Sequence, residues 1–401
     1  MQCVTIDHSN FVGRIGIGRV YSGTIHQGDQ ILVVKNDGSS ATATVKQIFT
    51  FDYLGRTECQ EVGAGDIAAV VGIDRTDIGD VYTDPENPVE LEPIEIDPPT
   101  LSIVFEASTS PLVGRDGDIV GARQLKERLF NEAENNVTMK IEELEDKSGV
   151  EVSGRGILHL SVLMESMRRE GFEFAVSKAE VLYKYDERNR KLEPMEIAYV
   201  DVPDDFTGAV IQKLTSRKGE LQGMSPIGGG YTRLEFSIPS RGLIGYRGEF
   251  MTDTKGNGIL NTSFDGYAPF KGELSYRKQG SLIAFEAGES ITYGLFNAQE
   301  RGTLFIGPGV KVYSGMIVGQ SAKPEDIELN VCKTKKLTNT RSSSADEALR
   351  LVPPKIMSLE QCLDYIDTDE LLEITPTSLR IRKKILDPTL RKRAMISRKN
   401  S

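Results

Sequence analysis

Two consecutive stretches of the sequence, 100–188 and 189–276, show the same order of predicted elements. Each begins with an apolar strand and continues with a helix, two strands, a second helix and a last strand. This β-α-β-β-α-β order is that of a ferredoxin-like domain. Because single cores rarely grow beyond about 250–300 residues, a chain of 401 residues is expected to divide into three or four domains. We therefore expect two ferredoxin-like domains in the middle of the chain.

The helical spacing supports this interpretation. Ala122, Leu125, Leu129 and Ala133 share one helical face, and a second helix is predicted from Ile157 to about Gly171. In 189–276 the second helix is predicted over 241–255. The second helices also share a short sequence, which reads Arg155-Gly-Ile-Leu in the first stretch and Arg241-Gly-Leu-Ile in the second. These two arginines would either cap neighbouring strand ends or bind RNA phosphate.

Residues 1–83 are predicted to be all β. Short apolar runs alternate with turn residues, and Asp37-Gly38 between two such runs is a strong hairpin signal. Closure would remove the strand edges, so we expect a closed β-barrel. Residues 84–99 contain six acids, five prolines and no base, which is the composition of a stiff linker.

Residues 277–401 are predicted to form a separate β-rich domain with short helices. Strands are expected over 281–285, 290–296 and 310–318. Ser358-Leu-Glu-Gln361 has the pattern of a capping box, and Asp387-Pro388 that of an N-cap followed by proline at the first helical position. The fold class is therefore multidomain β and α+β: a β-barrel, two ferredoxin-like domains and a β-rich C-terminal domain.

Composition excludes several classes of protein. The 48 lysines and arginines against 59 acids give a net charge of −11, so any binding to nucleic acid has to be local. No apolar run approaches the roughly 20 residues of a membrane span, and the N-terminus lacks the pattern of a signal peptide. The four cysteines are far apart without a Cys-x-x-Cys, which predicts reduced thiols in the cytoplasm and no structural zinc.

One basic segment interrupts this acidic chain. The segment 331–341 carries Lys333, Lys335, Lys336 and Arg341 and no acid, and it follows a strand-like run. Lysine and arginine on a polar loop can replace the counterions around phosphates. The loop 333–341 is therefore a candidate RNA-binding site, and the alternative is an ordinary solvated surface loop.

The C-terminal tail is a second basic patch. From 380 to 399 it carries nine bases and one acid, and Arg382, Lys383 and Lys384 are candidate RNA contacts. The alternative is a disordered end that only raises solubility.

No catalytic constellation is evident in the sequence. The phosphate-binding pattern Gly-x-x-x-x-Gly-Lys-[Ser/Thr] is absent, and so is Gly-x-Ser-x-Gly. The carboxylates of Glu142, Glu143, Glu145 and Asp146 are clustered, but a solvated strand face explains them better than acid–base or metal chemistry. His159 beside an apolar stripe is expected to be a partly buried histidine. We expect this chain alone to catalyse nothing.

Several motifs resemble a known family. The run 18–31 and the strand 65–70 resemble the second domain of translational GTPases, and the two ferredoxin-like units resemble the third and fifth domains of elongation factor G. The most specific motifs are Lys335-Lys-Leu-Thr-Asn-Thr-Arg341, Leu351-Val-Pro-Pro354 and Thr375-Pro-Thr-Ser-Leu-Arg-Ile-Arg-Lys383. Together they resemble the BipA (TypA) family of ribosome-associated GTPases. Members begin with a GTP-binding domain, and the chain looks like the family without it.

The resemblance implies binding across the A site of the 70S ribosome. Lys333, Lys335, Lys336, Asn339 and Arg341 would contact ribosomal RNA or the tRNA acceptor end, with polar contacts from Asn339. It further implies a cytoplasmic protein with a role in ribosome assembly and in growth under cold or other stress, and we expect a monomer. GTP and Mg²⁺ would belong to the missing domain. Two other hypotheses are a protein-interaction module with an inert basic loop and an enzyme that uses the 142–146 carboxylates.

Overall fold

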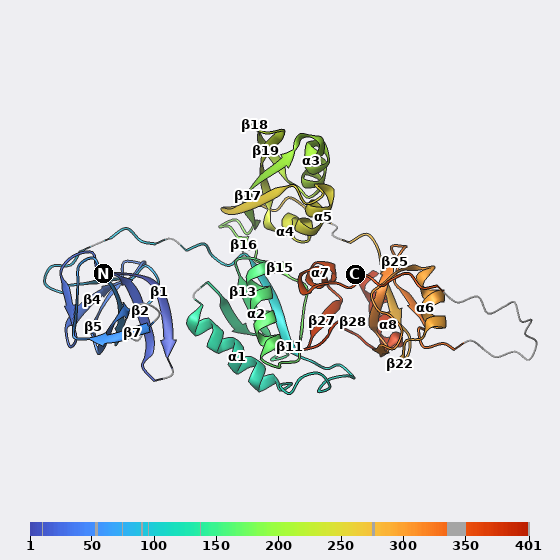
Figure 1. Ribbon diagram of the computed structural model, residues 1–401, viewed down its shortest axis with the longest axis horizontal. Helices are drawn as coiled ribbons and strands as arrows, with labels where there is room; N and C mark the ends of the chain where they lie inside the picture. The colour runs from blue at the N-terminus through green and yellow to red at the C-terminus, as the bar shows by residue number, and fades with distance from the viewer. Residues whose placement is uncertain are drawn as a thin grey trace, which may run out of the picture. The chain divides into compact units, whose positions relative to one another are not determined.

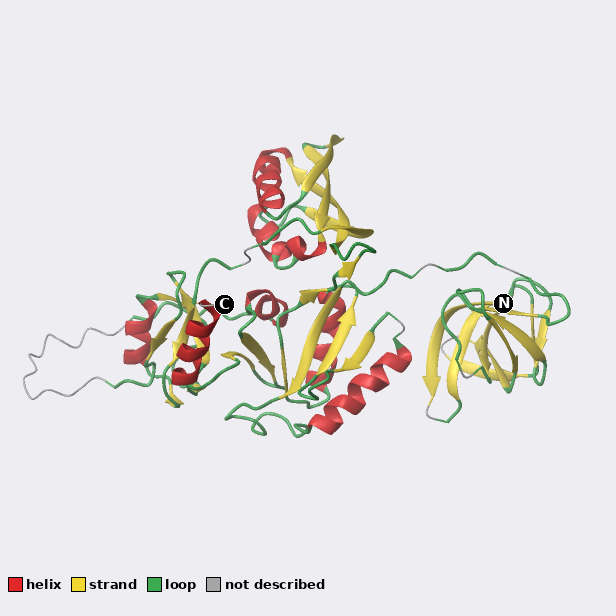
Figure 2. Cartoon of the chain, turned by 180° about the vertical axis from the view of Figure 1, so that it is seen from behind, coloured by secondary structure: helices red, strands yellow, loops and turns green. Residues whose placement is uncertain are grey.

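The computed structural model describes residues 1–9, 11–52, 55–73, 75–89, 91–94, 96–136, 138–274, 277–334 and 350–399 (Figure 1). The chain divides into two compact units, one of Met1–Pro99 with Lys126–Ile141 and the other of Thr100–Leu125 with Glu142–Ser401. Strands predominate in both, as Figure 2 shows in yellow. None of the helices in the described ranges combines the length and the apolar character of a membrane span.

The N-terminal region is an eight-stranded antiparallel sheet with the order β5-β4-β10-β1-β2-β9-β6-β7. Its strands are β1 (Gln2–Ser9), β2 (Gly13–Arg19), β4 (Gln30–Val34), β5 (Ser40–Thr44), β6 (Gln47–Asp52), β7 (Gly55–Cys59), β9 (Ile67–Val71) and β10 (Val81–Thr83). The short strands β3 (Thr24–His26) and β8 (Glu61–Gly63) pair separately, yet Ile25 and Val62 join the same apolar core as Ile48 and Val70.

The expected closure of this barrel is wrong for the described residues, because the sheet is open between β5 and β7. Both end strands are polar and mostly exposed, and β5 reads Ser-Ala-Thr-Ala-Thr. Polar edge strands are another way to limit edge-to-edge association, so this sheet does not need closure for that purpose.

Both predicted ferredoxin-like units are present. The first consists of β11 (Leu101–Ala107), α1 (Ala122–Asn135), β12 (Lys140–Glu143), β13 (Val150–Gly154), α2 (Ile157–Arg169) and β14 (Phe174–Val176). The second consists of β17 (Lys191–Pro203), α3 (Thr207–Ser216), β18 (Glu220–Gly228), β19 (Tyr231–Pro239), α4 (Ser240–Leu243), α5 (Tyr246–Asp253) and β20 (Ile259–Pro269). Counted within each unit, the strands lie in the order 2-3-1-4 in both, which confirms the repeat.

The second helix of the second unit differs from its prediction as one helix over 241–255. It is divided into α4 and α5, because Gly245 adopts a φ of +72°, which is incompatible with a right-handed helix. Both parts contact the same core, which contains Tyr246 and Phe250 of α5 and has Leu243 of α4 packed against it.

The sheet of the first ferredoxin-like unit continues into the C-terminal region. Strand β27 (Glu370–Ile374) pairs with β14, and its hairpin partner β28 (Leu379–Lys383) pairs with β25 (Met316–Ser321). Beyond them follow β21 (Ser281–Ala284) and β26 (Ile327–Leu329), the latter parallel to β21. The region 277–401 therefore shares one continuous sheet with 100–188.

The helices of the C-terminal region are α6 (Thr292–Gln299), α7 (Leu359–Tyr365) and α8 (Pro388–Lys399). The capping box at Ser358 and Gln361 is confirmed, and the Asp387 carboxylate accepts a hydrogen bond from the Leu390 amide at 2.8 Å, as an N-cap does. The predicted strand 290–296 is wrong. Residues 292–296 of this stretch begin α6, which buries Leu295 and Ala298, three positions apart, in the core of this region.

Candidate nucleic-acid interface

The described residues on either side of the basic loop both contact helix α6. Before the loop, Val331 is buried and accepts a hydrogen bond from the Ile291 amide at 3.0 Å. A Cβ on Gly294 would lie only 2.2 Å from the Val331 carbonyl oxygen, so α6 packs directly on this stem. After the loop, the Gln299 side chain donates to the Arg350 carbonyl at 3.2 Å and accepts from the Val352 amide at 3.1 Å. Both stems are thus held by one helix.

The last described residues before the loop are fixed by side-chain contacts. Asn330 donates to Glu286 at 2.7 Å and accepts from the Cys332 amide at 2.8 Å. Lys333 follows at once, and its side chain is exposed. Of the predicted loop contacts, Lys335, Lys336, Asn339 and Arg341 lie outside the described residues. The structure therefore describes the base of the loop and shows that one of its predicted cations, Lys333, is exposed.

The predicted RNA contacts Arg382 and Lys383 are corrected by the structure. Their side chains are only 3% and 2% exposed, because β28 directs them into the interior. Arg382 lies 2.9 Å from a carboxylate oxygen of Glu373 and donates to Thr109 at 2.8 Å. Cations neutralised in this way cannot replace counterions on RNA. Lys384, the third candidate in this tail, is exposed.

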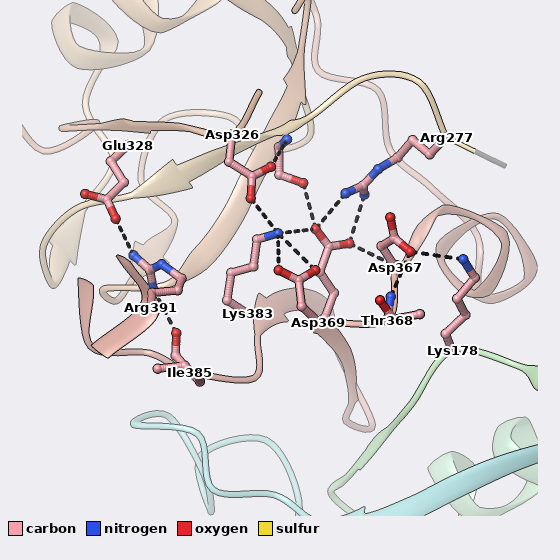
Figure 3. Close-up of polar contacts among 12 residues, drawn as sticks. Lys178, Arg277, Asp326, Glu328, Asp367, Thr368, Asp369, Lys383, Ile385 and Arg391 are labelled. Atoms are coloured by element: carbon pink, nitrogen blue, oxygen red, sulfur yellow. Dashed lines mark hydrogen bonds and ion pairs between the residues drawn. The ribbon is translucent and has the colours of Figure 1, made fainter. Parts of the chain in front are cut away.

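Lys383 belongs to a buried ion network (Figure 3). Its ammonium lies 2.7 Å from Asp326, 3.1 Å from Asp369 and 2.9 Å from Glu370. Burial alone would lower the pKa of Lys383, but the three carboxylates outweigh it and raise the pKa. Glu370 is also bound by both terminal nitrogens of Arg277, at 2.8 and 2.9 Å. Burial would raise the pKa of Glu370, and the two cations instead hold it below its usual range.

Two further cations of the tail are used internally. Arg380 binds Asp116 at 2.9 Å and Glu373 at 3.2 Å. Arg391 binds Glu328 at 2.7 Å and donates to the Ile385 and Leu386 carbonyls at 2.9 Å, which joins α8 to β26. The tail is therefore an ordered strand and helix, so the alternative of a disordered end is wrong for residues 380–399.

The structural interpretation of Arg241 is supported. Its side chain is 4% exposed and is bound to the fully buried Glu193, with 3.1 Å between Nη2 and Oε1. Arg155 is exposed, and its carbonyl accepts a hydrogen bond from Thr100 at 3.0 Å. His159 is half-buried, as expected.

Glu142, Glu143, Glu145 and Asp146 are all exposed, in agreement with a solvated strand face. Within the described part of the chain, no group of three or more histidines, cysteines and acids could hold a metal ion.

The carboxylates that neutralise the tail were not predicted from the sequence. A signal for them exists in the hairpin of β27 and β28, where Glu370 is opposite Lys383 and Glu373 is opposite Arg380. Directly opposed charges on neighbouring strands stabilise each other. Aligning the acidic run before the turn with the basic run after it would have indicated internal ion pairs.

Three family models match successive parts of the chain. The model described as Elongation factor Tu domain 2 matches residues 13–83, and Elongation factor G C-terminus matches 190–278. The model described as TypA/BipA C-terminal domain matches 279–388, which includes the stems of the basic loop and the buried ion network.

Curated relatives from three bacteria are similar along nearly the whole chain. All three are named large ribosomal subunit assembly factor BipA. The relative from Synechocystis sp. is 46% identical over 96% of this chain and 64% of its own length. Those from Salmonella typhimurium and Bacillus subtilis are 45% and 42% identical over 98% and 100% of this chain, in each case 65% of their own length. The chain thus spans about two thirds of these relatives, and along that length it belongs to the BipA/TypA family.

Proposed function

We propose that this chain is the ribosome-binding portion of a BipA/TypA-type translational GTPase. The observation that carries the proposal is the 42–46% identity to proteins named large ribosomal subunit assembly factors. On this proposal the chain acts in the cytoplasm as a monomer and binds at the ribosomal A site. Its role is in assembly of the large subunit and in adaptation to cold and other stress.

The proposed contact with ribosomal RNA and the tRNA acceptor end is the loop 333–341. Its support is electrostatic. The chain carries a net charge of −11, and the tail cations Arg380, Arg382, Lys383 and Arg391 are paired with the protein's own carboxylates. Lys333 is exposed at the base of a loop whose two stems are both held by α6. A cationic loop on a fixed base suits a polyanion, because each phosphate contact releases counterions.

The proposal assigns GTP and Mg²⁺ to a domain outside these 401 residues. The sequence contains no Gly-Lys pair, which the phosphate-binding loop of such a domain requires. GTP hydrolysis is therefore not attributed to any residue described here.

The test is binding of the chain to 70S ribosomes and to isolated large subunits over a series of salt concentrations. We compare the wild type with a variant in which Lys333, Lys335, Lys336 and Arg341 are replaced by alanine. Loss of four phosphate contacts should flatten the slope of log K against log salt by roughly 3 units.

The matched control replaces four exposed cations elsewhere, namely Lys46, Arg75, Lys311 and Lys323, by alanine. This control has the same net charge as the loop variant, so a general effect of net charge would change the salt slope of both variants equally. An unchanged slope in the loop variant, or an equal change in the control, would contradict the role of the loop.

A further inference from the structure

A second cationic surface lies on the hairpin 184–191. Strand β16 (Lys184–Tyr185) pairs with the start of β17, so that Lys184 is opposite Leu192 and Tyr185 is opposite Lys191 (Figure 1). The turn is closed by a hydrogen bond from the Asp186 amide to the Arg190 carbonyl at 3.1 Å, with Asn189 in the left-handed region at a φ of +57°. The hairpin 184–191 therefore has a defined conformation.

Its lysines lie on aromatic rings. The Lys191 ammonium is 3.5 Å from the centroid of the Tyr183 ring and 4.6 Å from that of Phe270. The Lys184 ammonium is 4.0 Å from the centroid of the Tyr267 ring. Tyr183 and Phe270 meet edge to face at 5.9 Å. Such cation–π contacts restrain an ammonium without cancelling its charge.

The Phe270 ring is held in place by Arg241 and by the hairpin strand. The guanidinium of Arg241 lies 4.5 Å from the centroid of the Phe270 ring, and Arg241 is fixed by the buried carboxylate of Glu193. The Phe270 amide donates to the Lys191 carbonyl at 3.1 Å, which ties the ring to the hairpin strand. The lysines are thus positioned before any ligand arrives, so binding would cost little ordering entropy.

The charge of the hairpin is only partly compensated. Within the described ranges, Lys184, Lys191 and the side chain of Arg188 make no ion pair with a carboxylate. Asp186 is occupied by Arg190 at 2.6 Å, which leaves Glu187 as the one opposing charge of the segment. The segment 184–191, with four cations and two acids, therefore has a formal net charge of +2 on a chain that is acidic as a whole.

An exposed aromatic ring completes the surface. Tyr185 is 63% exposed and lies on the strand between Lys184 and the turn. A large exposed ring beside uncompensated cations combines the two features that hold single-stranded nucleic acid, which are a stacking platform and charges that follow the backbone. Paired bases are not accessible to such a ring, whereas bases in loops and bulges of RNA are.

We infer that the hairpin 184–191 is a second RNA-contact surface, distinct from the loop 333–341, and that it binds single-stranded RNA. Tyr185 stacks on a base, and Lys184, Arg188 and Lys191 contact the neighbouring phosphates. The inference rests on the proposed function in one respect, namely that ribosomal RNA is the polyanion this chain meets.

The experiment measures binding of the full 401-residue chain to a fluorescein-labelled oligouridine of about 12 nucleotides by fluorescence anisotropy, within the range of typical single-strand sites. Tyr185→Ala should weaken binding roughly 5- to 150-fold, the loss expected for one stacked base. Tyr185→Phe keeps the ring and should bind as the wild type does. Tyr21→Ala, which removes a tyrosine of similar exposure in the other unit, is the matched control and should also bind normally.

The charge contribution is tested separately. The variant with Lys184→Ala and Lys191→Ala should flatten the salt slope by roughly 1.4 units, and Arg188→Ala by roughly 0.7. Because Lys184 and Lys191 also pack on rings, Arg188→Ala keeps the test valid if the double variant folds poorly. A duplex RNA of the same length should bind more weakly than the oligouridine and should not respond to Tyr185→Ala.

Equal binding of oligouridine by Tyr185→Ala and the wild type would overturn the inference. The inference would also be overturned if polyglutamate fully displaced the oligouridine and Tyr185→Ala had no effect on binding. That pattern would indicate a surface for an acidic protein partner. The loop variant described above separates the two proposals. If wild-type chain does not bind ribosomes while oligouridine binding depends on Tyr185, the proposed function fails and the hairpin inference stands.

Discussion

Replacing Lys383 by methionine tests whether the tail cations hold the fold together. Methionine has a similar length but leaves Asp326, Asp369 and Glu370 without their shared ammonium. Removing one partner of a buried ion pair typically costs 3–5 kcal/mol. We expect the lower end, about 3 kcal/mol, because Asp326 and Asp369 are 16% and 30% exposed and can regain water, and Glu370 keeps Arg277.

The assay is thermal and urea unfolding followed by circular dichroism. At 2–4 °C per kcal/mol for domains of this size, the melting temperature of the C-terminal unit should fall by roughly 6–12 °C. The matched control is Lys384→Met, one residue further along, where the side chain is exposed. That control should change the free energy of unfolding by no more than about 0.5 kcal/mol.

The difference in the free energy of unfolding between the wild type and Lys383→Met should depend on pH in a direction that the two pKa shifts define. The pKa of Lys383 is raised in the folded state, so its contribution is complete below the ordinary value of 10.5 and is lost as the pH rises further. The pKa of Glu370 is lowered from 4.5, so its contribution is present above that pH and is lost as the solution becomes more acidic. The difference between wild type and Lys383→Met should therefore be constant between about pH 5 and pH 10 and shrink on either side.

Equal stability of Lys383→Met and Lys384→Met would refute this reasoning. If Lys383→Met kept full stability but lost affinity for ribosomes with a flatter salt slope, Lys383 would be an RNA contact after all.

Two further predictions concern packing and pH. Gly294→Ala should destabilise the C-terminal unit by about 1–3 kcal/mol and weaken ribosome binding, because its Cβ would meet the Val331 backbone. Gly208→Ala on α3, with no atom within 4 Å of the added carbon, should be neutral or stabilising in the same urea titration. Burial, and to a smaller extent the charge of Glu360, raises the pKa of Asp364 to about 6. The wild type should therefore lose stability relative to Asp364→Asn as the pH rises from 3.8 to about 6. Asp367→Asn should show the opposite trend at lower pH in the same urea titrations, with the wild type losing stability relative to the variant as the pH falls below 3.8. Burial would raise the pKa of Asp367, but Lys178 and the Thr368 amide hold it below 3.8. No difference in trend between the two asparagine variants would contradict the assignment.

Local patterns in the sequence predicted the local structure well. The repeated element order, the helix α1 with Leu125 and Leu129 buried, and the caps at Ser358 and Asp387 depend on residues a few positions apart, and all are present. The pairing of β14 with β27 could not be predicted in this way, because no spacing rule relates residues so distant in the chain. Helix α6 was missed because Ile291-Thr-Tyr is typical of strands, and tertiary packing of Leu295 and Gly294 decided otherwise.

The candidate site shows what a count of charges can and cannot reveal. Lys333 is an exposed cation, as its polar surroundings indicated, while Lys335, Lys336, Asn339 and Arg341 stay a prediction. Arg382 and Lys383 are basic like the residues of the loop, but both are buried because both faces of β28 are covered at these positions. Only the fold shows which of these cations are exposed, because charge alone does not distinguish a surface cation from one that is paired in the interior.

The continuous sheet sets an order of events during synthesis. Phe174 pairs with Ile374, so the free edge of β14 on a growing chain waits about 200 residues for its neighbour. At translation rates of roughly 5–20 residues per second, this wait lasts on the order of 10–40 seconds. Over that interval the newly made segment presents an unpaired strand to any other nascent polypeptide. The edge of the first ferredoxin-like unit is therefore covered only after β27 has been made and has reached β14.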